Sequence, residues 1–393
     1  MTPSARIQAA IDILDKVIIA AQSKTAPADR IMSEWARANR YAGSKDRRAV
    51  RELVFGAIRA CGPVPANGRA AMLRLAQTDP QILPLFDGSQ YGPAAIGEGE
   101  EPTPGGVAPD WLVRKLFQSD ITGDEATALL SRAPLDVRVN SLKTDRGAVM
   151  AAHEGEALVA PHAIRYPTGT RVDDWAEAKD GKLEVQDLGS QIACLAVEAK
   201  AGETVIDLCA GAGGKALALA AAMDNLGTLI ASDTDRRRLG ECNHRMVRAG
   251  ATNIETVLLN PNKEAERLEP WNASADAVLV DAPCSGSGTW RRKPETRWRL
   301  SPDVLDEFAA VQDRLLAIGA SLVKPGGRLV FVTCSLLDQE GPDRIAAFLE
   351  ANPDWKAQRP ALPAGRGHGD GTRLTPYHDG TDGFFIASLV LAC

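Results

Sequence analysis

The sequence predicts an α/β protein in which a mainly parallel sheet, covered by helices on both faces, follows a helical N-terminal part. Apolar runs of strand length recur after residue 200, such as TVIDLCA (204–210) and ADAVLVDAP (275–283), with helical patterns between most of them. Near-continuous apolar strands that alternate with helices are typical of a parallel sheet buried on both faces. Earlier in the chain, apolar residues recur at helical spacing instead.

The N-terminal part is predicted to be a small helical bundle. One apolar stripe at helical spacing begins at Ile7 and ends at Ala21, and a second begins at Val50 and ends at Cys61. Each stripe is too short to form a stable helix alone, so the helices must pack together. We expect this helical domain to cover residues 1–131.

Two further regions are predicted after the bundle begins. Residues 87–110 are rich in Gly, Pro and Glu and lack periodicity, which is typical of a linker. Residues 132–190 are expected to form a small α/β segment, because the short runs 137–143 and 159–166 flank a helical stretch near 146–157. The third domain is then 191–393.

The sheet domain contains the most regular pattern in the chain. Its other predicted strands are TLIASD (228–233), ETVLL (255–259) and RLVFVTC (328–334). A helix that ends at Leu322 is followed by the breaker Lys-Pro-Gly-Gly at 324–327. The late run at 384–391 suits a strand inserted antiparallel at or near the sheet edge.

Composition limits the class of protein. The 393 residues are 45% hydrophobic and 24% charged, which suits two or three globular domains. No run approaches the roughly 18 apolar residues of a membrane span, and Asp12, Asp15 and Lys16 interrupt the first apolar pattern, so we expect neither a membrane protein nor a signal peptide. Seven scattered cysteines without a CxxC pair argue against a disulfide framework or a structural metal, and favour the cytoplasm.

Charge is unevenly distributed along the chain. The net charge of −6, taken alone, argues against nucleic acid as a partner. Residues 1–75, however, carry 13 Lys and Arg against 6 Asp and Glu, whereas residues 76–131 carry 2 against 9. A basic module is therefore followed by an acidic segment, and the average hides both.

A glycine-rich turn follows the first strand of the predicted sheet. Glycines between a strand and a helix let the backbone approach a ligand, and the helix N-terminus offers free N–H groups. The spacing fits neither the dinucleotide nor the phosphate-loop motif, and it suits the methionine part of S-adenosylmethionine. Asp233, which ends the next strand, can accept hydrogen bonds from two ribose hydroxyls. The predicted cofactor contacts in the turn are Cys209, Ala210, Gly211, Ala212, Gly213, Gly214 and Lys215.

Two cysteines, Cys284 and Cys334, follow core strands and should face the same cleft. Methyl transfer to carbon 5 of a pyrimidine gives a chemical reason for both. That carbon becomes nucleophilic only after a thiolate adds to carbon 6, and loss of the carbon 5 proton later expels the thiolate. The addition also needs a proton or strong hydrogen bond at ring nitrogen 3, a task for an acid such as Asp281. No metal is required.

The chain resembles the Fmu/Sun-type RNA 5-methylcytosine methyltransferases over roughly residues 105–393. Residues 41–59 are similar, more weakly, to the NusB-like helical domain of the bacterial ribosomal RNA branch, which implies that residues 1–131 bind RNA and that residues 132–190 take part in RNA recognition. The motifs that carry the main resemblance are CAGAGGK (209–215), DAPCSGSG (281–288) with TWRRKPETRWR (289–299), TCSLLDQEG (333–341) and DGFFIASL (382–389).

This resemblance implies a Rossmann-like class I S-adenosylmethionine-dependent methyltransferase sheet and an RNA substrate. Cys334 would then be the nucleophile, while Cys284 would serve the release step. Asp233, Asp281 and the position of Asn260 would join the glycine-rich turn in binding the cofactor. Asn260 departs from the family pattern, which has aspartate there, but its amide oxygen can still accept a hydrogen bond from the adenine amino group.

The segment after Cys284 is the best local candidate for RNA contacts. Its basic side chains can hold phosphates while an extruded base occupies the pocket. The candidates are Arg291, Arg292, Lys293, Arg297, Trp298 and Arg299. We expect a cytoplasmic monomer that acts on RNA, most simply ribosomal RNA of the small subunit.

Three alternatives stay open at this point. The substrate could be transfer RNA, which the sequence does not separate from ribosomal RNA. An amino-group methyltransferase would need an aromatic residue where Cys284 stands and would leave Cys334 without a purpose. A non-enzymatic RNA-binding protein on a degenerate scaffold conflicts with the intact cysteines and glycine-rich turn.

Overall fold

The computed structural model describes residues 1–392 and divides them into two compact units. Cys393, the last of the seven cysteines, lies outside the described residues. The helical unit contains Met1–Arg132 together with Thr289–Pro302, and the sheet unit contains residues 133–288 together with those from 303 onward. The predicted boundary at 131/132 lies beside the end of the first stretch, whereas residues 133–190 belong to the same unit as the large sheet.

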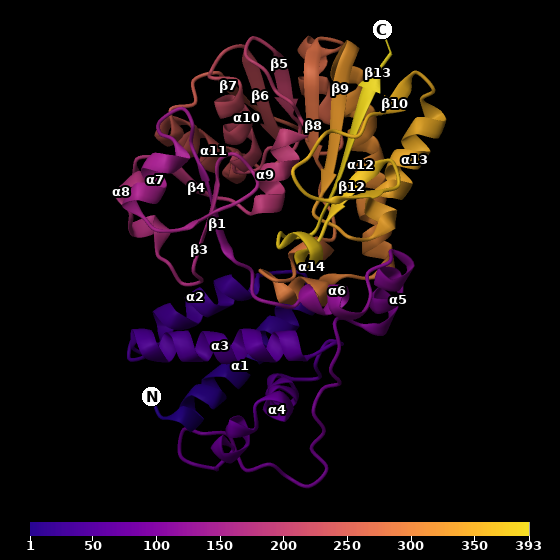
Figure 1. Ribbon diagram of the computed structural model, residues 1–393. Helices are drawn as coiled ribbons and strands as arrows, with labels where there is room; N and C mark the ends of the chain where they lie inside the picture. The colour runs from indigo at the N-terminus through magenta and orange to yellow at the C-terminus, as the bar shows by residue number, and fades with distance from the viewer. Residues whose placement is uncertain (393) are drawn as a thin grey trace. The chain divides into compact units, whose positions relative to one another are not determined.

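The helical unit is built as the apolar stripes predict (Figure 1). Ile7 and Ala21 of the first stripe, and Val50 and Cys61 of the second, are all buried. Its helices are α1 (Pro3–Gln22), α2 (Ala28–Ala38), α3 (Ser44–Ala60), α4 (Gly68–Thr78), α5 (Asp110–Gln118) and α6 (Gly123–Ala128). The two stripes pack into one hydrophobic core, so the prediction of a helical N-terminal part is confirmed.

A segment from far along the chain completes this helical core. Trp298, in the 3₁₀ turn Pro294–Arg299, is part of the same hydrophobic cluster as α1 and α3. The guanidinium of Arg297 donates hydrogen bonds of 2.6 Å to the carbonyl oxygens of Ile58 and Cys61 at the end of α3. The helical unit is therefore discontinuous in sequence.

The large sheet has the order β11-β12-β13-β9-β8-β5-β6-β7, with β10 paired to β13. Five strands are mutually parallel and follow the predicted runs, namely β5 (Thr204–Asp207), β6 (Thr228–Asp233), β7 (Ile254–Leu258), β8 (Ala275–Asp281) and β9 (Val323–Thr333). The remaining strands are β10 (Trp355–Ala357), β11 (Arg366–His368), β12 (Gly371–Leu374) and β13 (Phe384–Leu391). β13 runs antiparallel between β9 and β12, as a late strand near the edge should.

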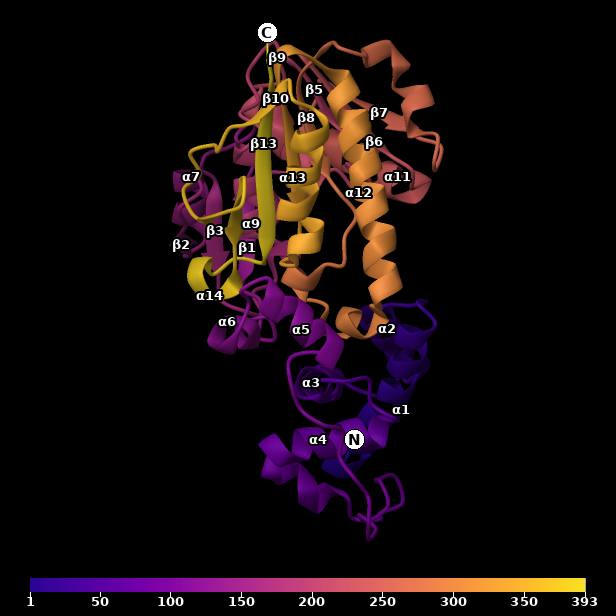
Figure 2. The same ribbon diagram turned by 90° about the vertical axis from the view of Figure 1, so that its right-hand side faces the viewer.

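Helices cover both faces of this sheet (Figures 1 and 2). Adjacent residues of one strand face opposite sides, since Val205 packs with the first face and Ile206 with the second. The first face carries α9 (Leu188–Leu195), α10 (Gly214–Ala222) and α11 (Arg236–Ala249), and the second carries α12 (Pro302–Leu322) and α13 (Pro342–Ala351). Burial on both sides explains the near-continuous apolar strands and confirms the predicted fold class.

The small α/β segment forms a second sheet in the order β2-β3-β1-β4, and its paired strands are antiparallel. Its elements are β1 (Leu135–Val139), α7 (Arg146–Ala152), β2 (Glu156–Ala157), β3 (Ala163–Tyr166), α8 (Ala176–Lys179) and β4 (Leu183–Val185). The predicted helical stretch near 146–157 was too long, because the chain turns at His153 into β2.

One strand boundary also differs from the prediction. β9 begins at Val323, so the predicted breaker at 324–327 lies inside the strand. The register with β8 shifts there, because Ala275 pairs with Val323 while Ala277 pairs with Arg328. The Pro-Gly-Gly run thus makes an irregularity in the strand rather than ending the pairing. Among residues 1–392, no helix is long and apolar enough to cross a membrane.

Candidate active site

A cavity of about 460 Å³ opens where the carboxyl ends of β5, β6, β8 and β9 meet. This is the edge at which open parallel sheets bind ligands. The predicted site residues that line it come from four separate strand ends, namely Cys209, Asp233, Asp281, Cys284 and Cys334. The fold therefore brings together residues that are up to 125 positions apart in the chain.

The glycine-rich turn is held beside Asp233. The N–H of Gly211 donates a 2.8 Å hydrogen bond to one carboxylate oxygen of Asp233, and the N–H of Asp235 donates one of 2.8 Å to the other. Gly213 caps α10 with a φ of +82°, and a Cβ there would lie 2.4 Å from the Sγ of Cys242. Glycine is thus required both for the backbone conformation and for the space. Of the seven turn residues, Cys209 lines the cavity, and residues 210–215 do not.

The predicted contact of Asn260 with the cofactor stays a prediction. Asn260 is exposed and does not line the cavity, whereas Leu259, Pro261 and Asn262 do. Asn262 adopts a left-handed conformation with a φ of +63°, so the chain turns sharply after β7. This turn brings the second asparagine of the Asn-Pro-Asn run, not the first, to the place where the sequence predicts an amide.

Cys284 and Cys334 both line the cavity, and their side chains are in contact. The Sγ atoms of Cys284 and Cys334 are 3.4 Å apart. The hydrogen bond with Cys334, together with burial, raises the pKa of the Cys284 thiol well above its usual range. Cys284 is therefore a protonated thiol at neutral pH, and it becomes a strong base when it loses that proton.

A buried carboxylate that the sequence reasoning missed joins the two cysteine loops. Glu340 is 0% exposed and accepts a 2.8 Å hydrogen bond from the N–H of Ser285 and one of 2.7 Å from the hydroxyl of Ser335. It also accepts from the hydroxyl of Ser285 and, at 3.2 Å, from the amide of Gln312. The only sequence signal was an acidic residue six positions after Cys334.

Asp281 forms an ion pair with Lys215. The Nζ atom of Lys215 lies 2.6 Å from one carboxylate oxygen of Asp281. Burial lowers the pKa of Lys215, but the charge of Asp281 and the hydrogen bond between them outweigh burial, so the net shift is upward. Lys215 therefore contributes through its side chain at the base of the site, in addition to its place in the turn.

The candidate RNA residues differ widely in exposure. Arg297 and Trp298 are buried, with exposed fractions of 0% and 4%, and the Trp298 indole donates a 3.3 Å hydrogen bond to the carbonyl of Gly62. Their polar groups are committed to the protein's own carbonyls, which speaks against RNA contacts by these two side chains. Arg291 is 4% exposed, Arg292 and Arg299 are half-buried, and Lys293 is exposed. Of the six, Lys293 is the most accessible to a phosphate.

Asp207, at the end of β5, is an unusual buried carboxylate beside this site. It is 0% exposed, and neither of its carboxylate oxygens has a hydrogen-bond partner of normal geometry among residues 1–392. Burial raises the pKa of Asp207 to about 7, and the neighbouring charge of Asp281 adds to this shift. Ionising Asp207 in the folded protein is therefore costly.

We expect Asp207→Asn to make the protein more stable, and more so at pH 8 than at pH 5. The unfolded carboxyl loses its proton near 3.8 and the folded one near 7. Stability therefore falls as the pH rises through this window and stays low above it, by at most about 4 kcal/mol. Thermal unfolding without cofactor at both pH values is the measurement. A variant of the exposed Asp370, Asp370→Asn, should show no such difference, and an equal shift at both pH values for Asp207→Asn would contradict the assignment.

Comparison with known proteins relates this site to one family. The family model described as 16S rRNA methyltransferase RsmB/F matches residues 194–390. The probable ribosomal RNA small subunit methyltransferase B of Bacillus subtilis is 32% identical over 303 residues, which are 72% of this chain. The match spans 66% of the length of that relative.

Solved structures show the same architecture. The crystal structure of PH0851 is 25% identical and superposes with a TM-score of 0.76 over 99% of both chains. A methyltransferase homolog protein from Pyrococcus horikoshii is 26% identical, with a TM-score of 0.61 over 72% of this chain and 99% of the other. The fold thus agrees with the methyltransferase interpretation of the sequence.

Proposed function

Since this chain belongs to the 16S rRNA methyltransferase RsmB/F family, we propose that it methylates carbon 5 of a cytidine in RNA, with small-subunit ribosomal RNA as the favoured substrate. The observation that carries the choice of carbon 5 is the pair Cys284 and Cys334, with sulfur atoms 3.4 Å apart beside the cavity. An amino-group methyltransferase needs no thiol, so a contact pair of thiols favours chemistry through a covalent cysteine adduct.

The cofactor of this methyltransferase family is S-adenosylmethionine, and the cavity fits it. Its volume of about 460 Å³ lies in the range of small-ligand sites. Asp233 offers carboxylate oxygens for ribose hydroxyls, and Asn262 and Leu259 provide a polar and an apolar contact for an adenine ring. When bound, S-adenosylmethionine supplies an electrophilic methyl group.

Cys334 performs the first covalent step. Its thiolate forms a bond to carbon 6 of cytosine, and the electron pair of the carbon 5–carbon 6 double bond moves into the ring as nitrogen 3 takes up a proton. Asp281 is the proposed partner of nitrogen 3. The Lys215 ammonium, 2.6 Å from Asp281, holds this carboxylate in place, and the proton reaches nitrogen 3 from solvent water through Asp281.

Cys284 performs the release step after carbon 5 has been methylated. Its thiolate removes the remaining carbon 5 proton, the double bond re-forms, and the bond between carbon 6 and the sulfur of Cys334 breaks. The raised pKa of Cys284 suits this role, because a thiol with a high pKa is a strong base once ionised. The short distance between the sulfurs supports a mechanism in which both steps act on one nucleobase.

Nucleoside analysis tests the proposal. The purified protein, given S-adenosylmethionine and unmethylated 16S ribosomal RNA, is expected to produce 5-methylcytidine, which chromatography with mass spectrometry separates from N4-methylcytidine. Cys334→Ala is the control and should give neither product. Bisulfite sequencing then locates the base. Methylation of the amino group, or of transfer RNA in place of ribosomal RNA, would contradict the corresponding part of the proposal.

A further inference from the structure

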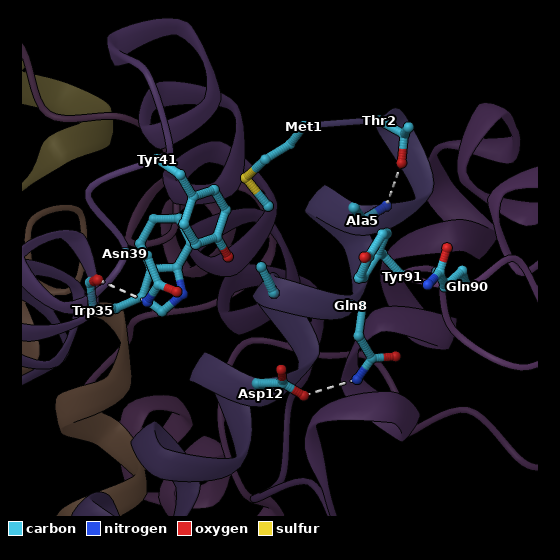
Figure 3. A pocket seen from close by; sticks show the side chains of 12 residues that line it. Met1, Thr2, Ala5, Gln8, Asp12, Trp35, Asn39, Tyr41, Gln90 and Tyr91 are labelled. Atoms are coloured by element: carbon cyan, nitrogen blue, oxygen red, sulfur yellow. Dashed lines mark hydrogen bonds between the residues drawn. The ribbon is translucent and has the colours of Figure 1, made fainter.

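The helical unit contains a groove of about 850 Å³ that the chemistry above does not use. It lies between α1, the end of α2 and the segment around Tyr91 (Figure 3). Asn39, Tyr41 and Trp35 line one side of it in this view, and Gln8, Gln90 and Tyr91 line the other, with Asp12 at one end.

Two large aromatic side chains stand exposed in this groove. Tyr41 is 74% exposed and Tyr91 is 69% exposed, and neither hydroxyl makes a hydrogen bond with any residue in the described range. Exposed aromatic faces serve as platforms on which unpaired bases stack. Two such faces in one groove are more than the isolated exposed apolar residue that every protein surface carries.

Polar groups in the groove are those that read the edge of a base. The amide of Gln90 has no partner within residues 1–392, and the amide nitrogen of Asn39 donates to the carbonyl of Trp35 at 2.9 Å, which leaves its oxygen available. Asp12 accepts a 2.7 Å hydrogen bond from Gln8. A carboxylate repels phosphate but accepts hydrogen bonds from the exocyclic amino groups of adenine, cytosine and guanine. Asp12 therefore favours a base over a phosphate at its end of the groove.

Positive charge surrounds Tyr41 in the sequence. Arg37, Arg40, Lys45 and Arg48 are all exposed, and none of them forms an ion pair with another described residue. They lie on the end of α2, the following turn and the first turn of α3. These cations are close to Tyr41 in sequence, although none of them lines the groove, and cations without an ion pair can supply the contacts to phosphate that dominate affinity for nucleic acid.

We propose that this groove binds unpaired nucleotides of the RNA substrate. The bases stack on Tyr41 and Tyr91, an amino-bearing base edge faces Asp12, and the backbone phosphates lie on the cations from Arg37 to Arg48. This inference rests on the proposed function, since it takes RNA to be the substrate. It adds a second RNA contact within the helical unit, where none of the catalytic groups lies.

Binding of single strands by the full chain tests the groove. Fluorescence anisotropy with labelled ten-nucleotide oligo(A) and oligo(U) should show tighter binding of oligo(A), because uracil lacks an exocyclic amino group. The double variant Tyr41→Ala with Tyr91→Ala should weaken oligo(A) binding about tenfold or more. The double phenylalanine variant, which keeps both rings, should bind like wild type. Asp12→Ala, which removes both acceptor oxygens, should remove the preference for oligo(A).

Phe117→Ala is the matched control, since Phe117 is 69% exposed in the same unit but does not line the groove. It should bind like wild type, and equal melting temperatures would show that all variants fold. If the double alanine variant binds oligo(A) as tightly as wild type, the groove serves a different partner, such as a protein, and the proposal is overturned. Nucleoside analysis of the same preparations keeps the two ideas apart, because loss of 5-methylcytidine formation with the binding pattern intact would refute the proposed function alone.

Discussion

Cys284→Ala is expected to leave the protein covalently attached to its RNA. Cys334 can still add to carbon 6, and carbon 5 can still be methylated, but no thiolate removes the remaining proton at carbon 5. The bond between carbon 6 and the Cys334 sulfur therefore persists. With labelled RNA and S-adenosylmethionine, a denaturing gel should show a slowly migrating band that protease removes, together with at least a hundredfold loss of turnover.

The matched variants separate the roles of the two thiols. Cys334→Ala should form no adduct and no product, because the nucleophile is absent, and the double variant should behave in the same way. Cys194→Ala removes a thiol in α9 that lies outside the cavity, and it should turn over normally. An adduct in Cys334→Ala, or normal turnover in Cys284→Ala, would show that the roles have been assigned the wrong way round.

Glu340→Ala is expected to reduce the methylation rate by about a hundredfold or more, although Glu340 does not touch the substrate cavity. Removing this carboxylate leaves the N–H of Ser285 and the hydroxyl of Ser335 without their acceptor in a buried place. The loops that carry Cys284 and Cys334 would then lose the group that joins them. Catalysis is sensitive to such displacement because errors near 1 Å in the placement of reacting groups are costly.

A measurement of the distance between the thiols distinguishes positioning from general destabilisation. In the wild type, the sulfur atoms of Cys284 and Cys334 are 3.4 Å apart, so diamide should rapidly oxidise the two thiols to a disulfide. The loss of free thiols over time measures the rate. The disulfide should form more slowly in Glu340→Ala, at a temperature where this variant is folded. Glu340→Gln keeps the shape and one acceptor oxygen, so it should recover part of the rate, whereas Glu350→Ala on the exposed side of α13 should change nothing. If the disulfide forms in Glu340→Ala at the wild-type rate, Glu340 has no positioning role.

The fold and the centre of the site could be read from the sequence because their signals are local. A strand buried on both faces must be continuously apolar, so β5 and β8 are visible in any window that contains them. The residues that follow such strands lie at the same edge of the sheet, so the sequence predicts that Asp233, Cys284 and Cys334 lie together, and all three line the cavity.

The residues that were misplaced or missed depend on contacts between distant parts of the chain. From its sequence neighbours Arg297 is predicted to be a surface cation, but two of the carbonyls to which its guanidinium donates lie more than 230 residues away in the chain. Glu340 accepts a hydrogen bond from Ser285, which lies 55 residues earlier in the chain. The residues next to Glu340 in the sequence do not indicate this contact. Asn262 lines the cavity and Asn260 does not, because the chain turns sharply at Asn262, which has a left-handed conformation.

The discontinuous helical unit also has a consequence for the order in which the newly made chain acquires its structure. Residues 1–132 leave the ribosome first, but Trp298, a member of their hydrophobic core, is synthesised much later. At the usual rate of translation, roughly 10 to 30 seconds separate the two events. During that interval the carbonyls at the end of α3 have no guanidinium to bind and the core has no indole to fill it. Residues 1–132 are therefore made well before their own hydrophobic core can be completed.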